Sequence, residues 1–388
     1  MRETRLDELL HHFVENGPSG AALSVMKSSQ TVYENYVGYA NKEEGILIDS
    51  NTIYRIFSMT KIVTCVAALQ LLEQGKLLLT DPIAEYLPEF KEMEVYHSGS
   101  GINLKTSTAK KPILVKDLFK MTSGLTYGGN GTEVERLTSM VMREVSQLEE
   151  KAGESLLQQF SRRLAGLPLE FEPGTHWKYG LSHDVLGALI EVVTGMSFGQ
   201  YLSTYIFNPL QMEDTFFQVP DSKKHRLARL YDRNEDGTLT HNTMLAKHAE
   251  PIAIIESGGA GLFSTLADYQ KFAHCLAMGG ELGDCRLLSK YSIQLLAQNH
   301  LNEKLLPELG WSYENGYGYG LGVRVMLDQT LGGSNSEIGE FGWSGLAGTY
   351  VLIDPKNQLS AVYMQQMLPN LETYHQPRIR NVVYGLIE

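Results

Sequence analysis

The chain has 388 residues, of which 43% are hydrophobic and 20% charged, and its 45 acidic and 33 basic side chains give a formal net charge of −12. Ordinary apolar content, with 37 Gly and 13 Pro, excludes collagen-like, disordered and disulfide-scaffold proteins. The acidic surplus disfavours nucleic acid and anionic membrane as partners, because both carry charge of the same sign. We expect a globular protein with a small-molecule partner, built as two or three folding units or as one two-lobed unit.

The cysteines and the N-terminus bear on location. Cys65, Cys275 and Cys285 share no metal or redox spacing and are interpreted as reduced thiols. The first ten residues contain acids and lack the apolar stretch of a secretory signal. No later apolar run approaches the roughly 20 residues that span a bilayer. The sequence therefore predicts a cytoplasmic protein.

The chain opens with a predicted helix, a hairpin and a second helix. Apolar residues at helical spacing predict a helix over Leu6–Val14. Two strand-like runs, Ala21–Met26 and Thr31–Tyr39, flank a polar turn and predict an antiparallel hairpin. From Ser58 to Gln74 the apolar residues keep a 3.6-residue period, and Gly75 follows as a C-cap signal.

The middle of the chain is mostly helical in pattern, and the C-terminal part returns to strands. Helices are predicted over Val115–Lys120, Val134–Leu164, Asp184–Thr194, Phe198–Ile206 and Ala267–Met278, with a polar surface loop or insertion at Tyr96–Lys111. Strands are predicted over Leu321–Leu327, Gly348–Ile353 and Leu359–Gln365, before a last helix at Ile379–Ile387. Strands at both ends predict one sheet built from the two termini, with an inserted helical lobe.

A Ser-x-x-Lys pair opens the second predicted helix, at Ser58 and Lys61. Residues three apart on a helix share a face, so the lysine can assist deprotonation of the serine. The helix N-terminus also favours a developing oxyanion. Ser107 and Lys110 repeat the spacing in the polar insertion, without apolar periodicity, and are interpreted as a chance match. The alternative for Ser58 is a helix N-cap.

Two further segments are candidates for the same chemistry. Tyr179 precedes a predicted helix, and its phenol can serve as a general base where a cation such as Lys61 lowers its pKa. The alternative is an ordinary half-buried aromatic residue. Trp343-Ser344-Gly345 leads into a strand whose backbone N–H can stabilise an oxyanion, and the alternative is a glycine-rich turn.

In this order the three segments resemble the serine β-lactamase and penicillin-binding-protein superfamily. Supporting stretches are Tyr54–Phe57, Leu79–Pro88, Leu118–Leu125 and Glu172–Thr175, and the resemblance spans about Ala21 to Gln366. It implies an α+β fold of the β-lactamase/transpeptidase type, with an antiparallel sheet from both termini flanked by helices and an inserted helical lobe.

Two positions depart from the β-lactamases and cell-wall peptidases. Leu181 stands where their second motif has Asn, and Trp343 stands where their third motif has Lys. The usual clamp on a β-lactam carboxylate and amide is thereby weakened, because an indole offers one donor and no charge. Trp-x-Gly in the third motif is instead similar to the family VIII carboxylesterases, and so we expect an esterase.

Residue roles follow from this resemblance. It implies Ser58 as nucleophile, Lys61 as its partner and Tyr179 as base, acting through an acyl-enzyme. The backbone N–H groups of Ser58 and Leu346 would form the oxyanion hole. The implied substrate-binding residues are Trp343, Ser344, Gly345 and Leu181.

No cofactor or metal is expected. The segment Asp232–Gly237 begins like a calcium loop, but its twelfth position is Thr243 in place of a bidentate glutamate, so a polar hairpin turn is predicted. The 11 histidines show no zinc-binding motif.

One active site drawing on the whole length predicts a single catalytic unit, residues 1–388. Within it we expect an α/β lobe of about 1–80 and 310–388 and a mostly helical lobe of about 81–309. The alternatives are an acyltransferase, a β-lactamase or a D-amino acid peptidase or amidase on the same scaffold, or a non-catalytic binding or sensor protein. The oligomeric state is left open.

Overall fold

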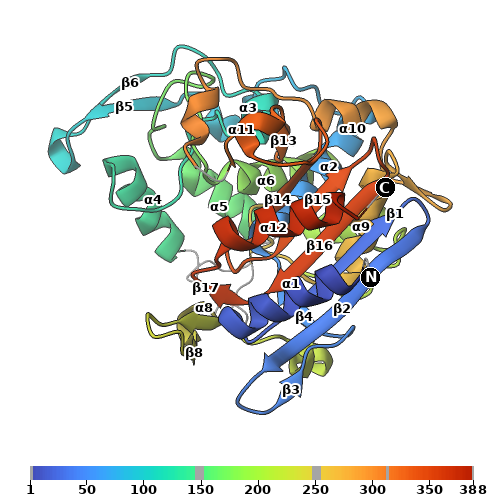
Figure 1. Cartoon of the computed structure of the whole chain (residues 1–388). Helices are drawn as coiled ribbons and strands as arrows, with labels where there is room; N and C mark the ends of the chain where they lie inside the picture. Colours follow the sequence, from blue (N-terminus) through green and yellow to red (C-terminus); the bar gives the residue numbers. More distant parts are fainter. Residues whose placement is uncertain (1–2, 145–152, 247–254, 312–313, 387–388) are drawn as a thin grey trace.

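A computed structural model describes residues 3–144, 153–246, 255–311 and 314–386. Its centre is an eight-stranded antiparallel sheet with the strand order β12-β13-β14-β15-β16-β1-β2-β3 (Figure 1). The strands are β1 Gly20–Lys27, β2 Gln30–Asn41, β3 Ile46–Leu47, β12 Tyr317–Tyr319, β13 Arg324–Met326, β14 Phe341–Ser344, β15 Tyr350–Asp354 and β16 Leu359–Gln365. Because β1 pairs with β16, the N-terminal hairpin and the C-terminal strands form one sheet, which confirms the predicted fold class.

Both faces of this sheet are covered by helices. Along β15, Tyr350 and Leu352 face the core under α1 (Glu3–Asn16) and α12 (Glu372–Tyr384), whereas Val351 belongs to the larger core on the opposite face. Figure 1 shows α1 and α12 side by side across the front of the sheet. This alternation is the period of two expected for a strand buried on both faces.

Most of the remaining helices come, in sequence, between the N-terminal strands β1–β3 and the C-terminal strands β12–β16 of the large sheet. They are α2 Thr60–Glu73, α3 Val115–Phe119, α4 Glu133–Glu144, α5 Leu156–Ala165, α6 Ser182–Thr194, α7 Phe198–Leu202, α8 Thr243–Ala246, α9 Leu266–Ala277, α10 Lys290–Leu296 and α11 Gln329–Gly332. Helix α9 packs on β16 and β1, and α2 packs against α6 in the larger core. Helix α2 is buried along nearly its whole length, which places its first turn inside the molecule.

Small sheets complete the architecture. They pair β4 Ile53–Arg55 with β9 Phe263–Thr265, β5 Glu94–Ser98 with β6 Lys105–Thr108, β10 Glu281–Leu282 with β11 Cys285–Arg286, and β7 Tyr231–Arg233 with both β8 Leu239–His241 and β17 Met367–Leu368.

The structure corrects four element boundaries. The stretch Val134–Leu164 forms two helices, α4 and α5, with residues 145–152 outside the described part. The segment Tyr96–Lys111 is largely the exposed hairpin β5–β6. Strand β12 was not predicted, because three residues are too short to show a period. The last helix begins at Glu372, seven residues before the predicted start.

No single helix of the described segments is long and apolar enough to cross a membrane. One pair, Ser182–Thr194 with Phe198–Phe207, has the length and composition to do so together, although the two parts are bent by 76°.

Candidate active site

The predicted nucleophile Ser58 lies in a tight turn between β4 and α2. Residues Phe57–Met59 form one turn of 3-10 helix, and α2 follows directly. Phe57 has a φ of +43°, a conformation that costs a residue with a side chain about 1–3 kcal/mol. The Ile56 carbonyl accepts a hydrogen bond from the Thr349 hydroxyl at 3.2 Å, which holds the turn in place. No side chain caps the start of α2, so Ser58 is not there as a helix cap.

Lys61 follows Ser58 by one helical turn and is completely buried. Its Nζ donates to Ser58 Oγ at 3.2 Å, to Tyr127 Oη at 3.0 Å and to the Gly259 carbonyl at 2.7 Å. Burial by itself lowers the pKa of Lys61, but the phenols of Tyr127 and Tyr179 outweigh it, and the net pKa is raised. Lys61 is therefore an ammonium ion at neutral pH, with all three N–H donors engaged.

Tyr179 lies against the same ammonium group. Lys61 Nζ is 4.6 Å from the centroid of the Tyr179 ring. The indole Nε1 of Trp343 donates to Tyr179 Oη at 3.0 Å, and the two ring centroids are 5.5 Å apart. The structure thus brings together Ser58, Lys61, Tyr179 and Trp343, although they come from three distant parts of the sequence.

Tyr127 is a member of this cluster that the sequence analysis missed. Its hydroxyl accepts from Lys61, and burial raises its pKa in spite of that neighbouring ammonium group. Gly180, the residue after the predicted base, permits the approach of the two loops: a Cβ there would lie 2.4 Å from the Leu125 carbonyl oxygen. The available signal was position, since Tyr127 follows the stretch Leu118–Leu125 that supports the family resemblance.

Asp184 is a second residue that the sequence analysis missed. Its Oδ1 accepts from the Ser257 hydroxyl at 2.5 Å and from the Gly259 N–H at 3.4 Å. Gly259 is the residue whose carbonyl accepts from Lys61, so Asp184 holds one of the three acceptors of the ammonium group. Burial raises the pKa of this carboxyl, against the hydrogen bond from Ser257 and the charge of Lys61.

The end of β14 passes directly beside the Ser58 turn. A Cβ at Gly345 would lie 2.2 Å from Thr349 Oγ1 and 2.4 Å from the Ile56 carbonyl oxygen, so this approach requires glycine. The next residue, Leu346, is half exposed and lines the same cavity as Ser58, as the predicted oxyanion-hole role requires.

A cavity of about 220 Å³ opens at Ser58. The residues that line it are Ser58, Tyr179, Trp311, Glu314, Trp343, Ser344, Gly345, Leu346, Asn370 and Glu372. This wall contains three aromatic side chains and two carboxyl groups, and it contains no Lys, Arg or His among the described residues. Leu181 is buried in the larger hydrophobic core outside the wall, so its contact with substrate stays a prediction.

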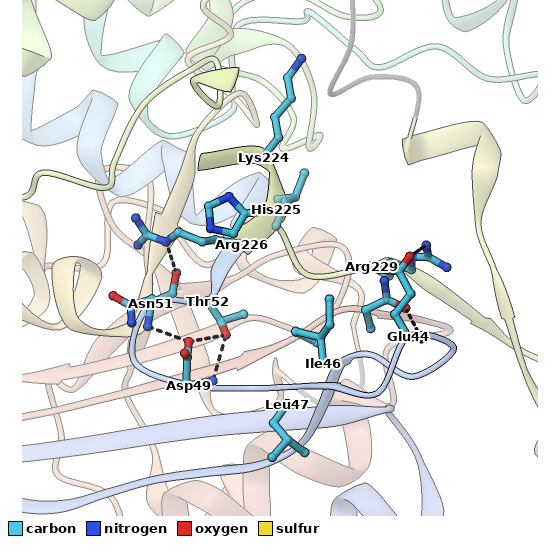
Figure 2. Close-up of a pocket in the computed structure, with 13 residues that line it drawn as sticks. Glu44, Ile46, Leu47, Asp49, Asn51, Thr52, Lys224, His225, Arg226 and Arg229 are labelled. Atoms are coloured by element: carbon cyan, nitrogen blue, oxygen red, sulfur yellow. Dashed lines mark hydrogen bonds and ion pairs between the residues drawn. The ribbon is translucent and has the colours of Figure 1, made fainter. Parts of the chain in front are cut away.

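A larger cavity, of about 590 Å³, lies elsewhere, between the β2–β4 segment and residues 224–229 (Figure 2). Its basic side chains are already paired. Arg229 contacts Glu44 at 2.6 Å, and Lys224 contacts Asp221 at 2.7 Å. The arginine and lysine side chains of this cavity are therefore already paired with carboxylates, and none is left uncompensated to bind an anion.

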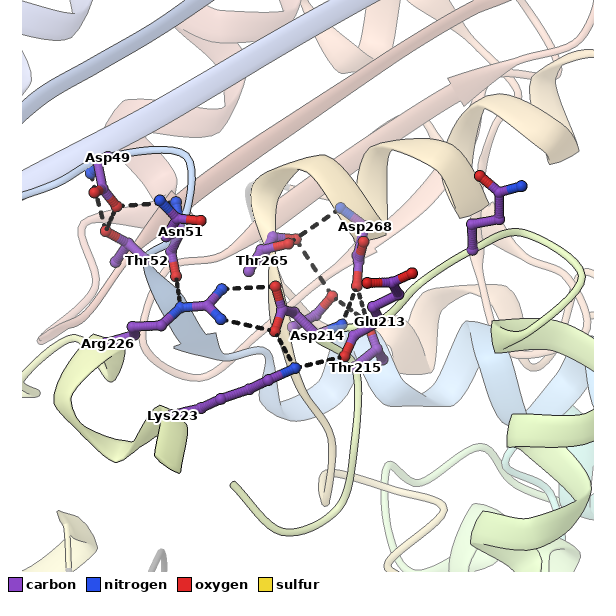
Figure 3. A network of polar contacts seen from close by, with 12 residues as sticks. Asp49, Asn51, Thr52, Glu213, Asp214, Thr215, Lys223, Arg226, Thr265 and Asp268 are labelled. Carbon is purple, nitrogen blue, oxygen red and sulfur yellow. Dashed lines mark hydrogen bonds and ion pairs between the residues drawn. The ribbon is translucent and has the colours of Figure 1, made fainter. Parts of the chain in front are cut away.

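Arg226, at the edge of that cavity, belongs to a polar network that ties its loop to the protein (Figure 3). It contacts both oxygens of Asp214 at 2.9 and 2.6 Å and donates to the Asn51 carbonyl at 2.7 Å. Lys223 contacts Asp214 at 2.7 Å. We assign this network a structural role.

In the part of the chain that the structure describes, no group of three His, Cys, Asp or Glu is arranged to hold a metal ion. The segment Asp232–Gly237 spans the end of β7 and the turn to β8, where the Asp236 carboxylate accepts from the Thr238 backbone and hydroxyl at 2.9 and 2.6 Å.

A serine beside a buried lysine and a tyrosine, on this fold, is typical of the serine β-lactamases and their relatives. A family model described as Beta-lactamase matches residues 6–383, and the chain belongs to this family. This match confirms the expected β-lactamase-type family. A solved structure of a family VIII carboxylesterase shares the fold, with a TM-score of 0.73 at 19% identity, covering 99% of this chain and 97% of that one.

Three proteins show how far the similarity of this chain extends, and two of them are named for an activity. Protein Rv1367c of Mycobacterium tuberculosis (strain ATCC 25618 / H37Rv) is 32% identical over 359 residues, covering 91% of this chain and 87% of that protein. Esterase EstB of Burkholderia gladioli is 25% identical over 367 residues, covering 89% and 85%. Simvastatin synthase (LovD) from Aspergillus terreus, unliganded, superposes with a TM-score of 0.84 at 23% identity, covering 99% and 98%. The chain is thus a β-lactamase-family enzyme of the serine hydrolase superfamily.

Proposed function

We propose that the protein is a serine carboxylesterase that cleaves esters of small acyl groups through an acyl-enzyme at Ser58. The observation that carries this proposal is the contact of Lys61 Nζ with Ser58 Oγ at 3.2 Å, at the edge of a cavity walled by Tyr179 and Trp343. Ser58 Oγ attacks the ester carbonyl, the alcohol leaves with a proton, and water then releases the acid and restores Ser58.

The protonation states favour Tyr179 as the base. Lys61 remains an ammonium ion because its pKa is raised, so it has no lone pair with which to accept the serine proton. Tyr179 lies against the same ammonium group and serves in this proposal as the base that accepts the proton from Ser58 and later activates water. Lys61 then positions Ser58 through its hydrogen bond to Oγ.

The wall of the cavity supports a neutral ester over a β-lactam. Trp343 offers one N–H, which Tyr179 already accepts, and no charge for a substrate carboxylate. The wall contains the carboxyl groups of Glu314 and Glu372 and, among the described residues, no basic side chain, so it offers an anionic substrate no positive charge. The backbone N–H groups of Ser58 and Leu346 serve in this proposal as the oxyanion hole.

The test is hydrolysis of p-nitrophenyl butyrate by the wild type and by Ser58→Ala, with Ser107→Ala as the matched control. Ser107 belongs to the second Ser-x-x-Lys match, on the hairpin strand β6. We expect Ser58→Ala to lose at least about a thousandfold in kcat, and Ser107→Ala to retain wild-type kinetics. Equal rates for wild type and Ser58→Ala would refute the proposal, and no covalent fluorophosphonate adduct by intact mass would favour a non-catalytic binding protein.

Acyl transfer is the second candidate, because a relative of this chain is named for it. The acyltransferase calJ of Penicillium decumbens is 25% identical over 354 residues, covering 87% of this chain and 81% of that protein. A peptidase is a further candidate, because putative D-alanyl-D-alanine carboxypeptidases of Escherichia coli and Salmonella are 24–26% identical to this chain. Product analysis with added alcohols or amines measures how the acyl-enzyme partitions between water and these acceptors.

We further propose a cytoplasmic location, and a small-molecule ester as the partner in place of nucleic acid or membrane. The net charge of −12 supports the choice of partner. Cell fractionation with an antibody against the native protein tests the location.

A further inference from the structure

The cavity at Ser58 is lined by three aromatic rings that pack against one another. The ring centroids of Trp311 and Trp343 are 5.9 Å apart with the planes at 57°, and those of Tyr179 and Trp311 are 5.5 Å apart with the planes at 78°. The part of an aromatic face that lines a cavity attracts cations through its negative quadrupole, and alkylammonium groups are ligands well suited to it.

Glu372 adds a carboxylate that no cation neutralises within the described residues. Its Oε2 accepts only from neutral donors, the Ser344 hydroxyl at 3.4 Å and the Gln376 amide at 3.3 Å. These bonds are long for a carboxylate, whose charge-assisted bonds are normally 2.7–2.9 Å. Glu372 therefore retains most of its capacity to pair with a positive charge.

Glu314, in the same wall, is also incompletely satisfied. Its side chain is 5% exposed, and its Oε2 has no hydrogen-bond partner among the described residues. The nearest cationic atom is Arg324 Nε at 3.7 Å, and this arginine already contacts Glu340 at 3.1 Å. A buried carboxyl oxygen without a donor is costly unless a ligand or water supplies one.

The buried arginines behind the cavity wall do not make the wall itself positively charged. Arg324 and Arg380 are buried and lie outside the set of residues that line the cavity. Arg324 contacts Glu340 at 3.1 Å and Glu314 at 3.7 Å, and both arginines act on Glu314. The cavity wall itself presents carboxyl groups and, among the described residues, no basic side chain.

We propose that the natural ester carries a cationic ammonium group, which binds against the cavity-lining surfaces of Trp311 and Trp343 and pairs with Glu372. The inference rests on the proposed esterase function and adds the charge of its substrate. Trp343 occupies the position at which the resembling β-lactamases and peptidases have a lysine, so the subsite that receives an anion there receives a cation here. The ammonium of Lys61 is outside the wall, with its three donors engaged.

Binding of choline and of its carbon isostere 3,3-dimethylbutan-1-ol, measured by tryptophan fluorescence, tests the inference without turnover. The two alcohols have the same shape and differ in one positive charge. We expect the full chain to bind choline about two- to thirtyfold more tightly than the isostere. Glu372→Gln removes a partly exposed charge and is expected to cut this ratio at least threefold, whereas Glu303→Gln, an exposed acid outside the cavity, retains it.

Equal or weaker binding of choline, or a ratio unchanged in Glu372→Gln, overturns the inference. Hydrolysis of butyrylcholine and 3,3-dimethylbutyl butyrate by the wild type then separates the two proposals. If both esters are cleaved without preference and both alcohols bind equally, the cationic subsite is refuted and the esterase proposal is supported. If choline binds more tightly than the isostere but neither ester nor p-nitrophenyl butyrate is cleaved, the esterase proposal is refuted and the cationic subsite is supported.

Discussion

The indole N–H of Trp343 donates to the hydroxyl oxygen of Tyr179 at 3.0 Å, although 164 positions separate the two residues. The same phenol ring lies 4.6 Å from the Lys61 ammonium. The tyrosine oxygen is thus held by one neutral donor while a buried charge lies beside its ring. Trp343 acts in this arrangement as a positioning residue for the proposed base.

Replacing Trp343 by Phe tests that positioning. The ring and most of its volume remain, but the hydrogen bond to Tyr179, worth about 0.5–1.5 kcal/mol, is lost. We expect kcat/KM for p-nitrophenyl butyrate to fall about three- to tenfold, with a shift of the pH–rate profile. Trp177→Phe is the matched control, because the Trp177 indole N–H is buried with no hydrogen-bond partner in the described part of the chain, and its ring centroid is 6.4 Å from that of Tyr179. Equal losses in both variants would contradict the role of the hydrogen bond.

Removing the hydroxyl of Tyr127 is predicted to disturb Lys61. In Tyr127→Phe the ammonium loses the acceptor at 3.0 Å and is left with one unpaired buried N–H. We expect kcat to fall about ten- to a hundredfold in steady-state assays, with little change in KM. Tyr319→Phe removes a buried hydroxyl for which the described residues provide no hydrogen-bond partner, and it is expected to retain activity. The Tyr319 ring centroid is 5.4 Å from that of Trp343, so this control lies next to the same cluster. An active Tyr127→Phe enzyme would show that two acceptors suffice for Lys61.

Asp184→Asn probes the support behind Lys61. The asparagine oxygen can still accept from Ser257, but the negative charge that faces the Lys61 ammonium is lost. We expect a loss of about 1–3 kcal/mol in the free energy of unfolding by urea titration. Because Asp184 acts through Gly259, the variant should also shift the pH–rate profile. A stability loss with an unchanged profile would assign Asp184 a purely structural role.

Much of the fold was accessible from the sequence because strands buried on both faces leave compact apolar runs. The hairpin Gly20–Asn41 and the strands Tyr350–Asp354 and Leu359–Gln365 were predicted within a few residues. The break in Val134–Leu164 was missed because its polar, charged residues continue a helical pattern across the interruption. The start of α12 was missed because Tyr374 and His375 pack against Phe13 at centroid distances of 6.0 and 4.0 Å, a contact with the other end of the chain.

The residues of the candidate site also fall into a group that the sequence predicted and a group that it did not. Ser58, Lys61, Tyr179 and Trp343 stand in local motifs, so spacing and family resemblance identified them. Tyr127, Asp184 and Glu314 have no such local pattern, since their importance comes from which atoms the fold places beside them. A buried carboxyl such as Asp184 is indistinguishable in sequence from any acid in the first turn of a helix.

The raised pKa of Glu314 predicts a pH-dependent stability. Burial raises it from 4.5 to about 7, against the opposing charges of Arg324 and Arg380 and with the like charges of Glu340 and Glu372. The folded state thus keeps a proton that the unfolded state has lost between these values. Stability must therefore fall as pH rises through this window, by about 3 kcal/mol from this group.

Urea titrations of wild type and Glu314→Gln at pH 5, 6, 7 and 8 measure this contribution. The glutamine variant does not ionise, so its free energy of unfolding relative to wild type is expected to increase from pH 5 to pH 7 and then level off. Glu303→Gln, at an exposed position, provides the control and should follow the wild type at every pH. A constant difference between Glu314→Gln and wild type would show that Glu314 is ionised throughout.

The substitution Gly345→Ala is expected to push the segment after β14 away from the turn that carries Ser58. The added Cβ would lie 2.2 Å from Thr349 Oγ1 and 2.4 Å from the Ile56 carbonyl oxygen, and a backbone carbonyl cannot move aside without moving the Ser58 turn. Overpacking of this kind costs about 1–3 kcal/mol, and we expect kcat/KM to fall about a hundredfold, because Leu346 and Ser58 shift apart. Gly166→Ala adds a methyl group whose nearest neighbour is 3.3 Å away, at a helix end remote from the cavity, and should leave kcat/KM unchanged. If Gly345→Ala retains full activity at normal stability, the close approach of β14 to the nucleophile turn is not needed for the reaction, and the oxyanion donor must be sought elsewhere than at Leu346.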